Sequence, residues 1–346
     1  MAGRVNAKGV QAESLITLSL PNMVSTENKE GLLREAIDIA REETLLSTEA
    51  RARLNLSILL FYDVGNLRAA KEEQIKAVEI HRKRGDLNGE LSFLFSLVWI
   101  LSVMGDLSEA EKVLEQIDQL DESLDHETTS LRGERLWGGS MYLYARGNIS
   151  EAVNGYRSLM SQPRNPYSDT DVFWAAQELG FGLIALGQLE EAEYVLLDVL
   201  EIADRGMIWQ PTLIRAQLSM VFTKQGKHDQ SQLMLEGAID SKPPGRMKWP
   251  NLIIDWAQSC ALAAEGNWDA AFQLFEGTVK EMQSAEVRLF EMEVMRDWAD
   301  AYLARNESGD TELARELLNG ALAAYLEMGA DGWVGHVESR LAEFES

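Results

Sequence analysis

The sequence has few of the residues that form disulfides, metal sites and sharp chain breaks. Its 346 residues include one cysteine, four histidines and seven prolines. A single cysteine, Cys260, excludes an internal disulfide and suits a reducing compartment. We therefore expect a cytoplasmic protein, with Cys260 as a buried and inert thiol.

Long apolar runs and basic residues are also scarce. We find no run that approaches the roughly 20 apolar residues of a membrane span, and residues 15–20 form too short and too polar a segment for a good signal peptide. Lysine and arginine number 32 against 56 acidic residues, a formal charge of −24. This balance disfavours nucleic acid and anionic membranes as partners. It indicates either a solvated acidic outer face or a basic partner.

A short glycine-containing segment recurs along the chain. The segment Gly187-Gln188-Leu189-Glu190-Glu191-Ala192 has counterparts that begin at five other glycines: Gly65, Gly105, Gly147, Gly226 and Gly266. Successive glycines lie 40, 42, 40, 39 and 40 residues apart. A fixed period in this range is typical of stacked-repeat solenoids.

Each of these segments joins two helical patterns. The glycine ends one helix in a left-handed conformation, and the next polar residue, such as Asn66 or Asn148, caps the following helix. We predict A helices before each glycine, near residues 10–20, 48–64, 88–104, 128–146, 170–186, 210–225, 249–265, 288–305 and 331–345. We predict B helices after it, near residues 28–43, 67–84, 107–120, 149–161, 189–204, 228–240, 268–284 and 311–328. The whole of 1–346 is then one solenoid, with an unfinished first hairpin in 1–25 and a capping helix in 330–346.

The spacing of small residues around the glycine resembles the tetratricopeptide repeat. The fourth repeat shows it best, with Gly180 seven residues before Gly187 and Ala192 five after it. The period of about 40 departs from the family's usual length of about 34, and longer repeats of this kind resemble the C-terminal regions of large bacterial signalling proteins. Those include LuxR-type ATP-binding regulators and multidomain nucleotidyl cyclases. The resemblance implies an all-α, right-handed superhelical solenoid of about eight hairpins that serves as a non-enzymatic interaction module.

Signatures of catalysis and of cofactor binding are missing. The sequence has no phosphate-binding loop, no dinucleotide fingerprint and no His-Glu-x-x-His motif. Its histidines, His81, His126, His228 and His336, lie in separate repeats, whereas a metal site needs several ligands that converge. We expect no enzyme activity, no cofactor and no metal.

The placement of aromatic residues is the clearest functional signal. In the tetratricopeptide pattern, positions two, five, nine and twelve of each A helix face the concave surface. With the turn residue numbered fifteen, these positions hold the apolar residues Phe95, Trp99, Trp137, Met141, Trp174, Phe181, Met220 and Trp256 and the polar residues Gln177 and Arg296. We call these ten residues the inner lane. Four tryptophans amount to ~600–1,000 Å² of apolar surface, more than the ~300–600 Å² of a typical largest surface patch.

Two interpretations of the inner lane follow from this area. Either it is an open binding groove, or tight curvature buries it within the array. An open groove would fit a protein or peptide partner, such as a basic segment or an amphipathic helix. Two alternatives are a small-ligand sensor, for a sugar for example, within a transcription regulator or cyclase, and an architectural subunit of a larger complex.

Overall fold

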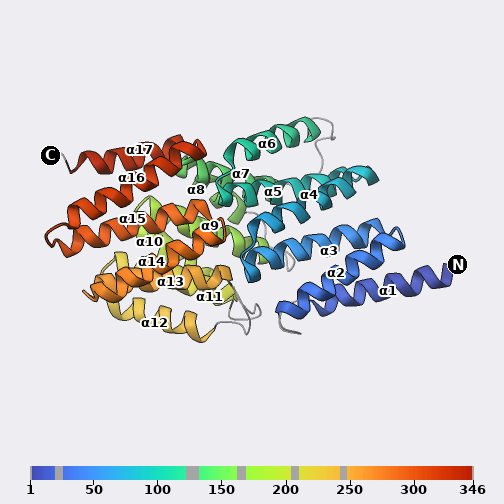
Figure 1. Ribbon diagram of the computed structural model, residues 1–346, viewed down its shortest axis with the longest axis horizontal. Coiled ribbons are helices and arrows are strands. Elements are labelled where there is room, and N and C mark those ends of the chain that lie inside the picture. The colour runs from blue at the N-terminus through green and yellow to red at the C-terminus, as the bar shows by residue number, and fades with distance from the viewer. Residues whose placement is uncertain are drawn as a thin grey trace.

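The computed structural model describes residues 2–19, 26–121, 132–161, 169–203, 210–241 and 248–344. These residues form seventeen α-helices and one π-helical turn, and no strand occurs among them. Figure 1 shows the helices stacked side by side, with the two termini at opposite ends of the long axis. The predicted all-α solenoid is confirmed.

The helix positions follow the glycine period. The A helices are α1 (Ala2–Leu18), α3 (Leu46–Leu59) with its π-helical continuation η1 (Leu60–Val64), α5 (Leu87–Met104), α7 (Arg132–Arg146), α9 (Asp169–Ala185), α11 (Gln210–Lys224), α13 (Lys248–Ala264), α15 (Arg288–Arg305) and α17 (Asp331–Ala342). The B helices are α2 (Thr26–Glu42), α4 (Leu67–Arg84), α6 (Leu107–Asp121), α8 (Ile149–Met160), α10 (Leu189–Ala203), α12 (His228–Asp240), α14 (Trp268–Ser284) and α16 (Asp310–Met328). Most predicted ends lie within two residues of these bounds. Helix α1 begins well before its predicted start, and residues 128–131 lie outside the described residues.

The turns between the A and B helices have the predicted geometry. Gly105 has a φ of 77°, and Asn306, which stands where a glycine is expected, has a φ of 55°. The Asn66 side chain accepts a hydrogen bond from Ala69 N at 3.0 Å and so caps α4. The predicted cap at Asn148 is wrong, because its side chain makes no capping hydrogen bond. There the left-handed turn at Gly147 (φ 84°) brings the chain into α8 without a side-chain cap.

Small residues allow the two helices of a hairpin to pack closely. In the sixth hairpin the Ser219 and Ser231 hydroxyls lie 2.9 Å apart, and both residues are buried. Ala192 and Ala271 hold the equivalent position in their hairpins and are fully buried. A larger side chain at these positions would force the paired helices apart.

The solenoid curves so strongly that A helices five hairpins apart contact each other. Turn η1 contacts α13, helix α5 contacts α15, and helix α7 contacts α17, so each of these A helices meets the one five hairpins further along. The backbones approach closely at these contacts: a Cβ atom added to Gly147 would lie 2.1 Å from the backbone N of Trp333. Arg146 and Asp331 form an ion pair at 3.0 Å across the same contact. We call this line of contacts the closing seam.

Helix α5 corrects one sequence-based expectation. It is 18 residues long with a mean hydropathy of 1.6, so in length and composition it could cross a membrane. Two thirds of it (67%) is buried within the protein. Its apolar character follows from its position, because neighbouring helices and α15 cover it on several sides.

Candidate functional site

The inner lane is largely buried, because helices from the other side of the closing seam cover it. Seven of its ten residues are at most 4% exposed: Phe95, Trp99, Met141, Gln177, Phe181, Met220 and Trp256. Three remain half-buried: Trp137, Trp174 and Arg296. The lane is therefore mainly core, and its role in binding stays a prediction.

A continuous column of aromatic rings joins the two halves of the chain. On one side, Trp137 stacks on Trp99 at a ring-centroid distance of 5.6 Å, and Trp99 packs edge-on against Phe61 at 4.6 Å. Phe61 then contacts Trp249 at 5.4 Å, a residue 188 positions further along the chain. The column continues through Phe290 and Phe181 to Trp256. These contacts account for the burial of the lane.

Three residues of this column were not predicted: Phe61, Trp249 and Phe290. They lie outside the four inner-facing positions of the repeat pattern. Phe61 on η1 contacts Trp249 at the start of α13, and Trp249 contacts Phe290 at the start of α15. Phe95 was placed in the lane but belongs to a smaller core cluster formed with α4 and α6. The face of α5 that carries Phe95 is covered by the neighbouring hairpins rather than by helices across the closing seam.

Five side chains near the middle of the chain carry buried polar atoms without a hydrogen-bond partner among the described residues. The atoms are the indole nitrogens of Trp99 and Trp137, the Tyr156 hydroxyl, both amide atoms of Gln177 and Oε1 of Glu178. We call these five residues the inner polar cluster. Buried polar groups of native proteins are nearly always hydrogen-bonded, so such a concentration marks a candidate site.

Helix α9 supplies the centre of this cluster. Trp174, Gln177, Glu178 and Phe181 recur at helical spacing and share one face of α9. Gln177 is 1% exposed and Glu178 is 2% exposed. Gln177 belongs to the predicted inner lane and Glu178 does not, although a glutamate within an otherwise apolar helix segment is the kind of signal that reveals such a residue.

Burial governs the ionisation of this centre. Loss of solvation raises the pKa of Glu178 to about 8, while the Trp99 indole N–H, which is directed at this carboxyl as a long hydrogen-bond donor, acts in the opposite direction. Burial and the charge of Glu178 also raise the pKa values of Tyr62 and Tyr156 well above their ordinary value. The three residues therefore lie close together, and the Glu178 carboxyl is mostly protonated at neutral pH.

A second buried acidic group lies on α15 and has partners. The Tyr144 hydroxyl lies 2.8 Å from both carboxylate oxygens of Glu293. Trp333 donates from its indole nitrogen to the backbone oxygen of Tyr144 at 2.8 Å, across the closing seam. Asp297 accepts from Trp256 and from Lys224, each at 2.8 Å. This group holds the closed form together.

Arg296 and Cys260, which the sequence also singles out, lie beside this second group. Arg296 places its guanidinium over the Trp333 ring, 4.6 Å from the ring centroid. The Cys260 thiol is half-buried and lies 3.7 Å from Oδ2 of Asp297. Burial and the Asp297 carboxylate raise the pKa of this thiol, so it is poorly nucleophilic. Among the described residues, no three His, Cys, Asp or Glu side chains converge as a metal site would require.

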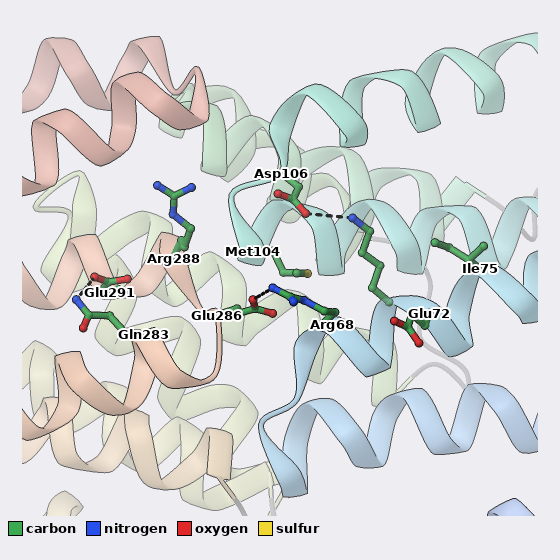
Figure 2. Close-up of a pocket in the computed structure, with 10 residues that line it drawn as sticks. Arg68, Glu72, Ile75, Met104, Asp106, Gln283, Glu286, Arg288 and Glu291 are labelled. Atoms are coloured by element: carbon green, nitrogen blue, oxygen red, sulfur yellow. Dashed lines mark hydrogen bonds and ion pairs between the residues drawn. The ribbon is translucent and has the colours of Figure 1, made fainter.

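A cleft of about 630 Å³ opens on the closing seam between α4–α5 and α14–α15. Figure 2 shows its charged side chains facing one another across the two halves. Arg68 pairs with Glu286, and Lys71 lies 3.1 Å from Asp106. Glu291 accepts from Gln283 at 2.8 Å. Most of the cleft's charged groups thus have partners within the chain.

Comparison with known proteins places the fold. No family model and no curated protein matches the sequence. Among solved structures, a Rap protein complexed with competence and sporulation factor is 15% identical to this chain, with a TM-score of 0.60. The match covers 99% of this chain and 99% of that one.

Two further structures share less of their geometry with this chain. Kinesin light chain TPR-like repeats from Podosopora anserina are 17% identical with a TM-score of 0.34, over 57% of this chain and 98% of that one. A signal transduction ATPase with a tetratricopeptide repeat sensor, from Pyrococcus horikoshii, is 13% identical with a TM-score of 0.41, over 91% of this chain and 50% of that one. The full-length likeness to the Rap protein carries the assignment. The chain therefore shares the all-α solenoid fold of that Rap protein.

Proposed function

We propose that this chain is a non-enzymatic interaction module that binds a protein or peptide segment at the inner polar cluster. The observation that carries the proposal is the set of buried polar atoms without partners on α5, α7, α8 and α9. The resemblance of its repeats to those of bacterial signalling proteins supports a role in a signalling or regulatory assembly.

The energetics favour an external partner for these atoms. Each buried polar group without a hydrogen bond costs roughly 1–3 kcal/mol, and the cluster contains six such atoms. A peptide backbone offers alternating N–H donors and C=O acceptors. The Gln177 amide can donate to one and accept from the other, and the two indoles can donate to further carbonyls. A bound segment would thus satisfy groups that the chain itself leaves unpaired.

The fold is compatible with this role. The Rap protein that shares it is complexed with competence and sporulation factor, so an array of this architecture can hold a bound partner. Trp137 and Trp174 are half-buried, whereas Trp99 and Glu178 are buried. This gradient supports access to the cluster from the side of the two half-buried tryptophans.

The cleft on the closing seam supports a small-ligand role less well. Its charged groups are largely satisfied by one another, as Arg68 with Glu286 and Lys71 with Asp106 illustrate (Figure 2). A ligand there would have to displace existing ion pairs. At the inner polar cluster, a ligand would meet polar atoms without a partner, and it would compete only with the Trp99 indole for the Glu178 carboxyl.

The proposal is tested with Gln177→Leu, which keeps the side-chain volume and removes both polar atoms. We expect the variant to be as stable as the wild type or more stable, because it removes two unsatisfied groups. A displayed library of random octapeptides should yield related binding sequences with the wild type. Those peptides should bind Gln177→Leu at least tenfold more weakly.

The control is Tyr194→Ala on α10, since Tyr194 is 73% exposed and does not belong to the inner polar cluster. It should bind the selected peptides as the wild type does. Failure of the wild type to enrich any related sequences, or equal binding by Gln177→Leu, would overturn the proposal.

A further inference from the structure

Among the polar groups of the inner cluster, Glu178 is the one that can carry a full charge. Its residue is 2% exposed, and Oε1 has no hydrogen-bond partner in the described parts of the chain. The charged group that acts on it most is another carboxylate, Glu293, and no basic side chain offsets it. By contrast, Asp297 has Lys224 at 2.8 Å.

Four aromatic rings that contact one another lie beside Glu178. Tyr62 contacts Trp99 at a ring-centroid distance of 6.3 Å and Trp174 at 5.3 Å. Trp99 in turn stacks on Trp137 at 5.6 Å. The rings come from η1, α5, α7 and α9, four separate elements that the fold brings together. Tyr62 lies on the π-helical turn, a local irregularity that often occurs at functional sites.

We propose, on the basis of the function proposed above, that Glu178 and these four rings recognise a lysine or arginine side chain of the bound segment. A cation is attracted to the faces of Trp and Tyr rings, and a carboxylate in a desolvated setting is its natural counter-ion. A carboxylate that has no basic partner among the described residues and lies beside aromatic rings suits a cation better than an anion or an apolar group.

Only a long side chain would reach the buried Glu178 from the half-buried Trp137 and Trp174. Lysine and arginine carry their charge at the end of an apolar stem that can lie along aromatic surface. The half-buried Trp137 and Trp174 would contact the stem, and the charged group would reach the buried Glu178. The net charge of −24 would also attract a basic segment over longer distances.

The experiment compares two versions of one library-selected peptide, with arginine or with citrulline at the same position. Citrulline has nearly the same shape as arginine and no charge. We expect the arginine peptide to bind the wild type about tenfold to a hundredfold more tightly. The preference should vanish in Glu178→Gln and persist in Glu291→Gln, the control at a different buried carboxyl. Circular dichroism and thermal melting establish that both variants fold.

A second readout separates recognition from a purely structural role. At pH 7 the free Glu178 carboxyl is mostly protonated, so binding of the arginine peptide should release close to one proton. Calorimetry in two buffers of different ionisation enthalpy measures this release. The other titratable groups near Glu178, namely Tyr62, Tyr156 and Glu293, are the same in Glu178→Gln, where the release should be lost.

The outcomes distinguish this inference from the proposed function. If selected peptides bind at the cluster but arginine and citrulline versions bind equally, the charge recognition is refuted and the binding function stands. An unchanged arginine preference in Glu178→Gln refutes it as well. If the library yields no binder, N-acetylarginine amide and N-acetylcitrulline amide serve as probes, and equal responses of tryptophan fluorescence to both refute the cation site directly.

Discussion

The buried Glu178 carboxyl should make the stability of the protein depend on pH, and Glu178→Gln should remove that part of the dependence. Burial raises the pKa of this carboxyl from 4.5 to about 8. Between these values the folded chain holds a proton that the unfolded chain has lost. Because the unfolded state then binds fewer protons, the free energy of unfolding falls as the pH rises. Below pH 4 both states are protonated and the penalty disappears.

The size of the effect follows from the difference between the two pKa values. Each unit corresponds to about 1.4 kcal/mol. The penalty in the wild type is therefore about 1 kcal/mol at pH 5, about 3 kcal/mol at pH 7 and about 5 kcal/mol at pH 9. Glutamine has nearly the same shape and does not ionise. The stability of Glu178→Gln relative to the wild type should consequently increase by about 4 kcal/mol between pH 5 and pH 9.

Urea unfolding followed by circular dichroism at constant ionic strength measures this difference. Other titrating groups, including Glu293 with its pKa of about 7, are present in both proteins and largely cancel in the comparison. Glu190→Gln on the exposed surface of α10 is the control and should show a constant difference from the wild type. A constant difference for Glu178→Gln as well would refute the reasoning, because it would mean that Glu178 is solvated or paired with a cation in the free protein.

Two further predictions concern the closing seam and the inner lane. Gly147→Ala and Gly187→Ala both place alanine at a positive φ, 84° and 69°, at a strain of about 1–2 kcal/mol. Only Gly147→Ala also drives a Cβ into the backbone of Gly332 and Trp333. Urea unfolding should therefore show that it lowers the free energy of unfolding by about 2 kcal/mol or more beyond Gly187→Ala. Equal losses of stability in the two variants would contradict the contact between α7 and α17. Trp256→Ala should cost about 3–5 kcal/mol because Trp256 is 2% exposed and stacked on Phe181. Trp137→Ala, at a half-buried position, should cost less in the same assay, and a small loss for both would show that the lane is open in solution.

Local features of this fold could be predicted from the sequence because they depend on neighbouring residues. The glycine at each turn has the left-handed conformation that ends a helix, and the period of the glycines locates the helices that follow. Asn306 lies 40 residues after Gly266, where the period predicts a turn. It takes the same left-handed conformation without being glycine. Small residues such as Ser219 identify where paired helices approach closely.

Closure of the solenoid could not be predicted in this way. Whether η1 contacts α13 depends on the curvature summed over five hairpins, and a small change of angle at each hairpin moves the ends by many ångströms. The repeat pattern therefore selected residues that face inwards, such as Trp99 and Phe181, without showing what lies opposite them. It also missed Phe61 and Trp249, which face each other only in the closed form.

The two buried glutamates differ in the partners that the fold gives them. Glu178 and Glu293 are both buried, and the pKa of each is raised first by loss of solvation. The fold supplies Glu293 with the Tyr144 hydroxyl and leaves Oε1 of Glu178 without a partner among the described residues.

Helix α7 takes part in both arrangements, since Trp137, Met141 and Tyr144 recur at helical spacing along it. Trp137 belongs to the inner polar cluster and Tyr144 to the closing seam. A segment that binds at Trp137 and Glu178 would therefore act on the same rigid helix that holds the seam closed, and the charge of Glu178 would act on Glu293 as well. Occupation of the cluster and stability of the closed form should be coupled for this reason.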